Sequence, residues 1–166
     1  TVVTGLTFTV TGTPPTAPAL DAAFSPGSIV TGGSSALTLT LSNSNTLPAV
    51  LSADFTDTLP SGLVASNAAT TCTGGTGASL GSGGNSLILG NGAAIPAGGS
   101  CTLTADVTSS AAGNYTNAIP AGALQTNAGN AAAASAALTV TGISAPTVTK
   151  SFAPASITTG AASTLT

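Results

Sequence analysis

Apolar and polar side chains alternate one by one along two long stretches of this chain. Leu37, Leu39 and Leu41 are separated by threonine, and residues 101–108 repeat the pattern as CTLTADVT. In an extended strand a period of two places alternate side chains on opposite faces. The pattern therefore predicts antiparallel strands with one buried face and one face toward solvent.

Shorter runs of the same kind fill much of the remaining chain, and clusters of Gly, Asn, Pro and Ser separate them. We expect further strands at 20–24, 51–56, 62–66, 69–73, 86–90, 114–119, 122–126 and 135–140. Many short strands with regular turn signals and no convincing helical period are typical of a sandwich of two antiparallel sheets. The predicted fold is all-β, an immunoglobulin-like antiparallel β-sandwich.

The composition leaves little chemistry for an enzyme. Among 166 residues, Lys and Arg total 1, Asp and Glu total 4, and His is absent. Because acid–base catalysis needs tuned titratable groups, we expect no enzyme, and we assign no cofactor and no metal site. The net charge of −3 offers no basic patch for nucleic acid. No run of about twenty apolar residues is present to span a membrane.

Two cysteines, Cys72 and Cys101, both fall in strand-like runs. Two thiolates do not complete a zinc shell, and there is no C-x-x-C motif to indicate redox catalysis. We therefore expect a disulfide, with a pair of buried free thiols as the alternative. A disulfide is typical of proteins that fold outside the cytoplasm.

A turn and a core position are also predicted. In the run FTDTLPSGL at 55–63, Pro60 suits the second and Gly62 the fourth position of a type I turn. Asp57 is expected to accept backbone N–H bonds at the strand end. Tyr115 is expected in the core with its hydroxyl bonded to backbone.

The chain repeats itself. Residues 18–38 align without a gap to residues 146–166 at an offset of 128 (152 − 24), and ten of the 21 aligned positions are identical. LTFTVTG at 6–12 likewise matches ALTVTG at 137–142. Self-similarity at a fixed spacing predicts a tandem repeat of about 128 residues.

The repeat divides the chain into four parts. They are the last strand of a preceding repeat at 1–12, a linker at 13–17, a complete repeat at 18–142, and a linker with the first strands of a following repeat at 143–166. Incomplete repeats expose apolar strands, which aggregate unless protein covers them. We expect assembly through Leu6, Phe8, Val10, Phe152, Ile157 and Leu165.

The motifs of the repeat resemble a known family. The T-D-T-L-P-x-G-L run at Thr56–Leu63 and the stretch Gly113–Asn117 are similar to the eleventh family of domains of unknown function and its relatives. Relatives opening with K-S-F-x-P match Lys150 to Pro154, whereas the complete repeat has Ala22 and Ala23 before its phenylalanine. The resemblance implies Ig-like sandwiches strung in tandem within large bacterial surface proteins.

These features favour a structural role. We expect a repeat unit of an extracellular bacterial fibre, stalk or sheath that assembles end to end with copies of itself. The alternative is an adhesin module that binds a glycan or a cell-surface partner through loops or a β-edge. No glycan site is located by the sequence.

Overall fold

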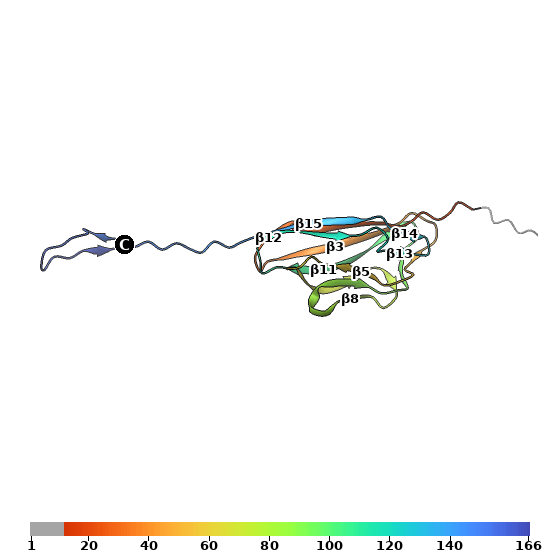
Figure 1. Ribbon diagram of the computed structural model, residues 1–166, viewed down its shortest axis with the longest axis horizontal. Helices are drawn as coiled ribbons and strands as arrows, with labels where there is room; N and C mark the ends of the chain where they lie inside the picture. The colour runs from red at the N-terminus through yellow and green to blue at the C-terminus, as the bar shows by residue number, and fades with distance from the viewer. Residues whose placement is uncertain (1–11) are drawn as a thin grey trace, which may run out of the picture.

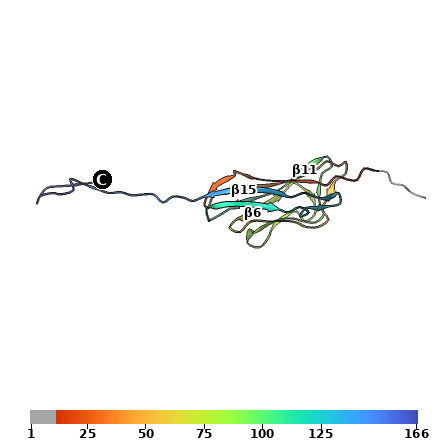
Figure 2. The ribbon, with the colours of Figure 1, turned by 45° about the horizontal axis from the view of Figure 1, so that its top comes forward.

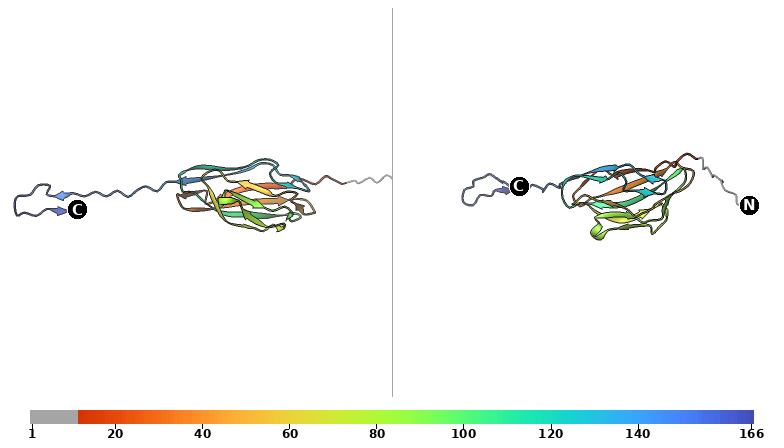
Figure 3. Two further views of the ribbon diagram at one scale, coloured as in Figure 1. Left: turned by 60° about the horizontal axis from the view of Figure 1, so that its bottom comes forward. Right: turned by 45° about the vertical axis from the view of Figure 1, so that its right-hand side comes forward.

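The computed structural model describes residues 12–166. An elongated β-sandwich is followed by an extended segment and a small hairpin (Figure 1). The strands of the sandwich form two layers, and a turned view shows the sandwich from another side, with the extended segment leaving one end (Figure 2). The chain enters the sandwich at one end and leaves it at the opposite end (Figure 3).

The first layer is a four-stranded antiparallel sheet. Its strands, in spatial order, are β1 (Ala19–Ser25), β3 (Ser34–Asn43), β11 (Gly99–Thr108) and β6 (Val64–Thr70). The central strands β3 and β11 are the two stretches with the longest alternation, and Leu39 lies opposite Leu103. Both leucines are fully buried, so the period of two places the apolar side chains toward the other layer.

The second layer consists of two three-stranded sheets. The first contains β12 (Gly113–Ile119), β15 (Ala134–Thr141) and β2 (Ser28–Val30), with β2 parallel to β15. The second contains β5 (Phe55–Thr58), β9 (Ser86–Leu89) and β8 (Ala78–Leu80). The two sheets approach each other where β12 contacts β5.

Shorter elements close the ends of the sandwich. They are the sheet of β4 (Ala49–Val50), β10 (Ala93–Ile95) and β7 (Thr73–Gly74), the hairpin of β13 (Gln125–Thr126) and β14 (Gly129–Asn130), and the 3-10 turn η1 (Ser82–Gly84). The all-β, Ig-like sandwich predicted from the alternation is confirmed. Within residues 12–166 no helix has the length and apolar character needed to cross a membrane.

Some strand boundaries differ from those predicted. Parts of the expected strands 62–66 and 69–73 join in one strand, β6, which continues from Val64 to Thr70 through a bulge, whereas residues 71–72 carry no strand and Thr73 belongs to β7. At this bulge Asn67 takes φ 54°, and the register with β11 shifts between Thr104 and Asp106. Of the expected strand 122–126, only β13 is extended.

The core lies between the layers and is built mainly from aliphatic side chains. Phe55 is fully buried among leucines such as Leu87 and Leu89, which lie on the partner strand β9. Beyond the sandwich, residues 142–151 carry no strand, and β16 (Phe152–Ala153) then pairs with β17 (Thr164–Leu165).

Candidate functional site

The hairpin of β16 and β17 has the same strand register as the first hairpin of the sandwich. Phe24 lies opposite Leu37 in the pairing of β1 with β3. Phe152 lies opposite Leu165 in the pairing of β16 with β17. Each residue of the second pair is 128 positions after its counterpart, which is the offset of the sequence repeat.

The turns inside the two hairpins share a side-chain hydrogen bond. The hydroxyl of Ser35 donates to the carbonyl oxygen of Pro26 at 2.6 Å. The hydroxyl of Ser163 donates to the carbonyl oxygen of Pro154 at 2.7 Å. Sequence analysis did not assign these serines a role, although both belong to the ten identical positions. The repeat in sequence is therefore also a repeat in local structure.

The hairpins differ in what covers them. Ile29 is 8% exposed and Leu37 is fully buried, whereas Ile157 is 52% and Leu165 is 53% exposed. Phe152 is 55% exposed. We call these three exposed side chains, Phe152, Ile157 and Leu165, the hairpin surface. It is the candidate functional site of the described residues.

In the sandwich, two of the equivalent residues have a further strand beside them. Leu37 lies opposite Ala105 in β11, and Ile29 lies opposite Val140 in β15. Within the described residues, β16 and β17 pair only with each other, so the hairpin surface has no counterpart of β11 or β15. The other side chains assigned to assembly, Leu6, Phe8 and Val10, lie outside the described residues.

The two cysteines form the disulfide that the sequence predicted. Cys72 and Cys101 are bonded, with their Cα atoms 4.9 Å apart. Cys101 lies in β11 and Cys72 lies in the segment between β6 and β7. Both are buried in the core. The bond links β11 to the loop that follows its neighbour β6.

Asp57 has a different partner from the one expected. It is the third residue of β5, where alternation points it inward with Phe55, so it does not lie at an exposed strand end. The Asn117 amide of β12 donates to the Asp57 carboxylate, Nδ2 to Oδ2, at 2.6 Å. Burial raises the pKa of Asp57, and the bond from Asn117 opposes this effect.

The sequence alone did not identify Asn117 as the hydrogen-bond partner of Asp57. The available signal was its place in β12, where Tyr115, Asn117 and Ile119 alternate on the inward face. A polar side chain at such a position needs a buried hydrogen-bond partner. Only the fold shows that this partner is Asp57, 60 residues away.

The turn after β5 begins one residue later than predicted. The Leu63 amide donates to the carbonyl of Pro60 at 3.1 Å, which makes Pro60 the first residue and Gly62 the third. Gly62 has φ 98°. A positive φ at the third position belongs to a type II turn and favours glycine, so the type I assignment was wrong.

Tyr115 is partly buried against the core, and its hydroxyl bonds to backbone as predicted. The hydroxyl donates to the carbonyl of Ala111 at 3.0 Å and accepts from the hydroxyl of Ser109 at 3.1 Å. A tyrosine that bonds backbone a few residues upstream is a recurrent feature of Ig-like sandwiches.

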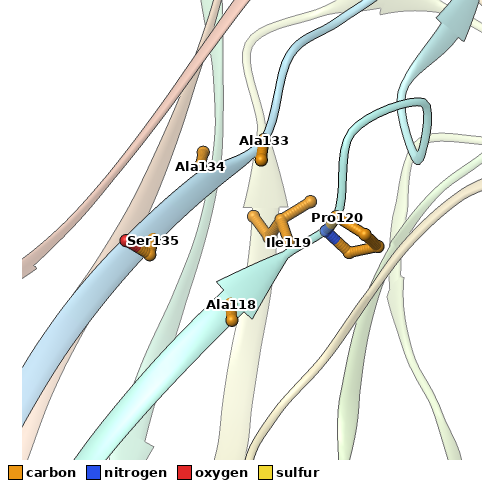
Figure 4. A pocket seen from close by; sticks show the side chains of 6 residues that line it. All are labelled: Ala118, Ile119, Pro120, Ala133, Ala134 and Ser135. Atoms are coloured by element: carbon orange, nitrogen blue, oxygen red, sulfur yellow. The ribbon is translucent and has the colours of Figure 1, made fainter.

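A shallow apolar pocket lies between the end of β12 and the start of β15. Figure 4 shows the side chains that line it, which are Ala118, Ile119, Pro120, Ala133, Ala134 and Ser135. None of these side chains titrates. In the part of the chain that the structure describes, no three His, Cys, Asp or Glu side chains gather as a metal site would require.

The paired layers and the Tyr115 bond define an Ig-like β-sandwich module. Residues 18–140 match the family described as Domain of unknown function (DUF7933), and the chain belongs to this family. No curated protein matches the chain.

Two solved structures share the fold. One is BslA, described as a bacterial hydrophobin, with 24% identity and a TM-score of 0.51; the match covers 80% of this chain and 100% of BslA. The other is the cohesin module of a family 33 glycoside hydrolase from Clostridium perfringens, with 9% identity and a TM-score of 0.52; the match covers 79% of this chain and 100% of that module. At these identities the likeness concerns the fold alone.

Proposed function

We propose that this domain is a structural module of an extracellular bacterial fibre, stalk or sheath, and that such modules join end to end. The complete module would be residues 18–142, and residues 143–166 would be a linker together with the first strands of the next module. This organisation is also what the resemblance to the eleventh family of domains of unknown function implies. The partner is therefore another module of the same kind.

The observation that supports this proposal is the hairpin surface. Phe152 and Leu165 pair as Phe24 and Leu37 do, yet they are more than half exposed. Exposed apolar strands associate with whatever covers them. The simplest cover is a set of strands that includes counterparts of β11 and β15, which pair beside Leu37 and Ile29 in the sandwich.

The shape of the molecule fits an axial arrangement. The chain enters and leaves the sandwich at opposite ends, so successive modules would follow one another along a line (Figure 3). Strands of about eight residues at roughly 3.3 Å each, with their loops, give an axial spacing on the order of 35–55 Å. Electron microscopy of the native assembly measures this spacing.

An experiment on the chain itself tests the role of the hairpin surface. We would replace Phe152, Ile157 and Leu165 together by serine and compare sedimentation and binding of an apolar dye with the unchanged chain. We expect the unchanged chain to self-associate and bind dye, and the triple variant to do neither.

Leu47, which is 74% exposed in the loop between β3 and β4, provides the control. Leu47→Ser should leave both association and dye binding unchanged. An unchanged chain that stays monomeric and free of dye at high concentration would contradict the proposal. Equal effects of Leu47→Ser and the triple variant would show that exposed apolar area in general, rather than the hairpin surface, drives association.

A further inference from the structure

A buried acid and a buried amide connect the two sheets of the second layer. Asp57 belongs to β5 and Asn117 to β12, and these strands lie in different three-stranded sheets. Asp57 is 1% exposed and Asn117 is fully buried. The bond from Asn117 Nδ2 to Asp57 Oδ2 therefore spans the place where the two sheets meet.

This pair leaves two buried oxygen atoms without a partner. They are Asp57 Oδ1 and Asn117 Oδ1. An ionised carboxylate oxygen and an amide oxygen both only accept hydrogen bonds. Neither of these two oxygens can therefore donate a hydrogen bond to the other. A buried polar atom without a partner destabilises a fold, because it has lost its bonds to water and gained none in return. One proton on Asp57 would supply the donor that Asn117 Oδ1 lacks.

The surrounding strands offer no cation to balance a carboxylate. β9, β15 and β3 contain no titratable side chain, and on β12 the hydroxyl of Tyr115 is engaged with Ala111. The other charged side chains of the sandwich are all acids: Asp54 is exposed directly before β5, Asp21 lies in β1 and Asp106 in β11. The one basic side chain of the sequence, Lys150, is exposed beyond the sandwich.

We propose that Asp57 is a neutral carboxylic acid in the folded domain, and that it closes a ring of two hydrogen bonds with the Asn117 amide. In this ring Asn117 Nδ2 donates to Asp57 Oδ2, and the protonated Asp57 Oδ1 donates to Asn117 Oδ1. The ring joins the two sheets of the second layer. Loss of the proton removes one bond and leaves a buried charge at the junction, so the stability of the module depends on pH.

The sign of the dependence follows from the raised pKa. Burial lifts the pKa of Asp57 above its ordinary value of 3.8, because the charged form is poorly solvated. The contribution of Asp57 to stability is then fully present below the pKa of the unfolded chain. It is lost as the pH rises through the native pKa. Between these two values the folding equilibrium constant falls by up to about tenfold for each pH unit.

The substitution Asp57→Asn provides the main test. An asparagine at this position donates to Asn117 Oδ1 and accepts from Asn117 Nδ2, so it keeps the ring without any charge. Urea unfolding between pH 3 and pH 8 should show that the wild-type chain loses stability as the pH rises. The variant should lose this dependence and be the more stable of the two at pH 7.

Asp54→Asn is the matched control. Asp54 is exposed, and its Oδ1 accepts a hydrogen bond from the backbone N–H of Asn91 at 2.7 Å, so Asp54→Asn should leave the pH dependence caused by Asp57 in place. The carbon-13 shift of the Asp57 carboxyl in the wild-type chain, followed across the same pH range, gives a readout that needs no variant, and the pKa that it reports should lie above 3.8. A pKa at or below 3.8, or an Asp57→Asn variant less stable than wild type at pH 7, would overturn the proposal.

Discussion

Gly62 lies against the ring of Tyr115, so closely that a Cβ atom on Gly62 would be 3.1 Å from the tyrosine hydroxyl oxygen. The turn after β5 and the strand β12 therefore meet without space between them. Since the same hydroxyl bonds to Ala111, the tyrosine has little freedom to move away.

We predict that Gly62→Ala lowers the free energy of unfolding by about 1–3 kcal/mol. The new methyl group meets Tyr115, and alanine is strained at φ 98°. Gly32→Ala separates the two causes, because Gly32 also has a positive φ, 78°, but a Cβ atom on Gly32 would have no neighbour within 4 Å. Urea denaturation should show the smaller loss for Gly32→Ala; equal losses would mean that the contact with Tyr115 has no effect.

The equivalent serines of the two hairpins provide a matched pair. Ser35 is 1% exposed and Ser163 lies in the exposed hairpin, although both donate to a proline carbonyl. Ser35→Ala should lower the free energy of unfolding of the sandwich by about 0.5–1.5 kcal/mol, because the hydrogen bond that the buried Ser35 hydroxyl donates to the Pro26 carbonyl is lost. Ser163→Ala should leave that value unchanged. Both are measured by thermal and urea unfolding, and a loss with Ser163→Ala would show that the hairpin supports the sandwich.

Reduction of the disulfide should weaken the fold. The bond closes a loop of 29 residues between Cys72 and Cys101. The chain-entropy account gives a stabilisation of about 3–4 kcal/mol for a loop of this size. Urea unfolding with and without reductant measures the difference, and mass spectrometry should find neither cysteine alkylated before reduction. Free thiols in the native protein would contradict the prediction.

Two phenylalanines should respond in opposite ways to truncation. Phe55 is fully buried, and Phe55→Ala should lower the free energy of unfolding by about 3–5 kcal/mol because it leaves a cavity. Phe152→Ala should leave the unfolding of the sandwich unchanged, since Phe152 is 55% exposed and belongs to the separate hairpin. Unfolding followed by circular dichroism tests both. A large loss with Phe152→Ala would show a contact between hairpin and sandwich.

Local patterns in the sequence were sufficient for the parts of the fold that depend on local spacing. The alternation around Leu39 and Leu103 predicted which side of each strand is buried, because side-chain direction depends only on position along the strand. The repeat also predicted that Phe152 corresponds to Phe24, and the two occupy the same register.

Turn details were less predictable. Pro60 and Gly62 correctly marked a turn, yet the hydrogen bond from Leu63 sets its start one residue later than expected. A proline suits more than one turn position, whereas the left-handed φ of Gly62 selects the turn type. That φ is a property of the folded backbone, and it also depends on how β12 approaches the turn.

By itself, the sequence determined that this chain forms Ig-like strands, that Cys72 and Cys101 suit a disulfide better than a metal or redox site, and that residues 146–166 repeat residues 18–38. Only the tertiary structure decided that Asp57 meets Asn117 and that Phe152 is more than half exposed whereas Leu37 is fully buried. The reason is that periodicity encodes which face of a strand is buried, whereas the partner across the core depends on how distant strands pack. Whether Asp57 is buried or lies at an exposed strand end depends on the strands that pack around it, and the local sequence does not specify those strands.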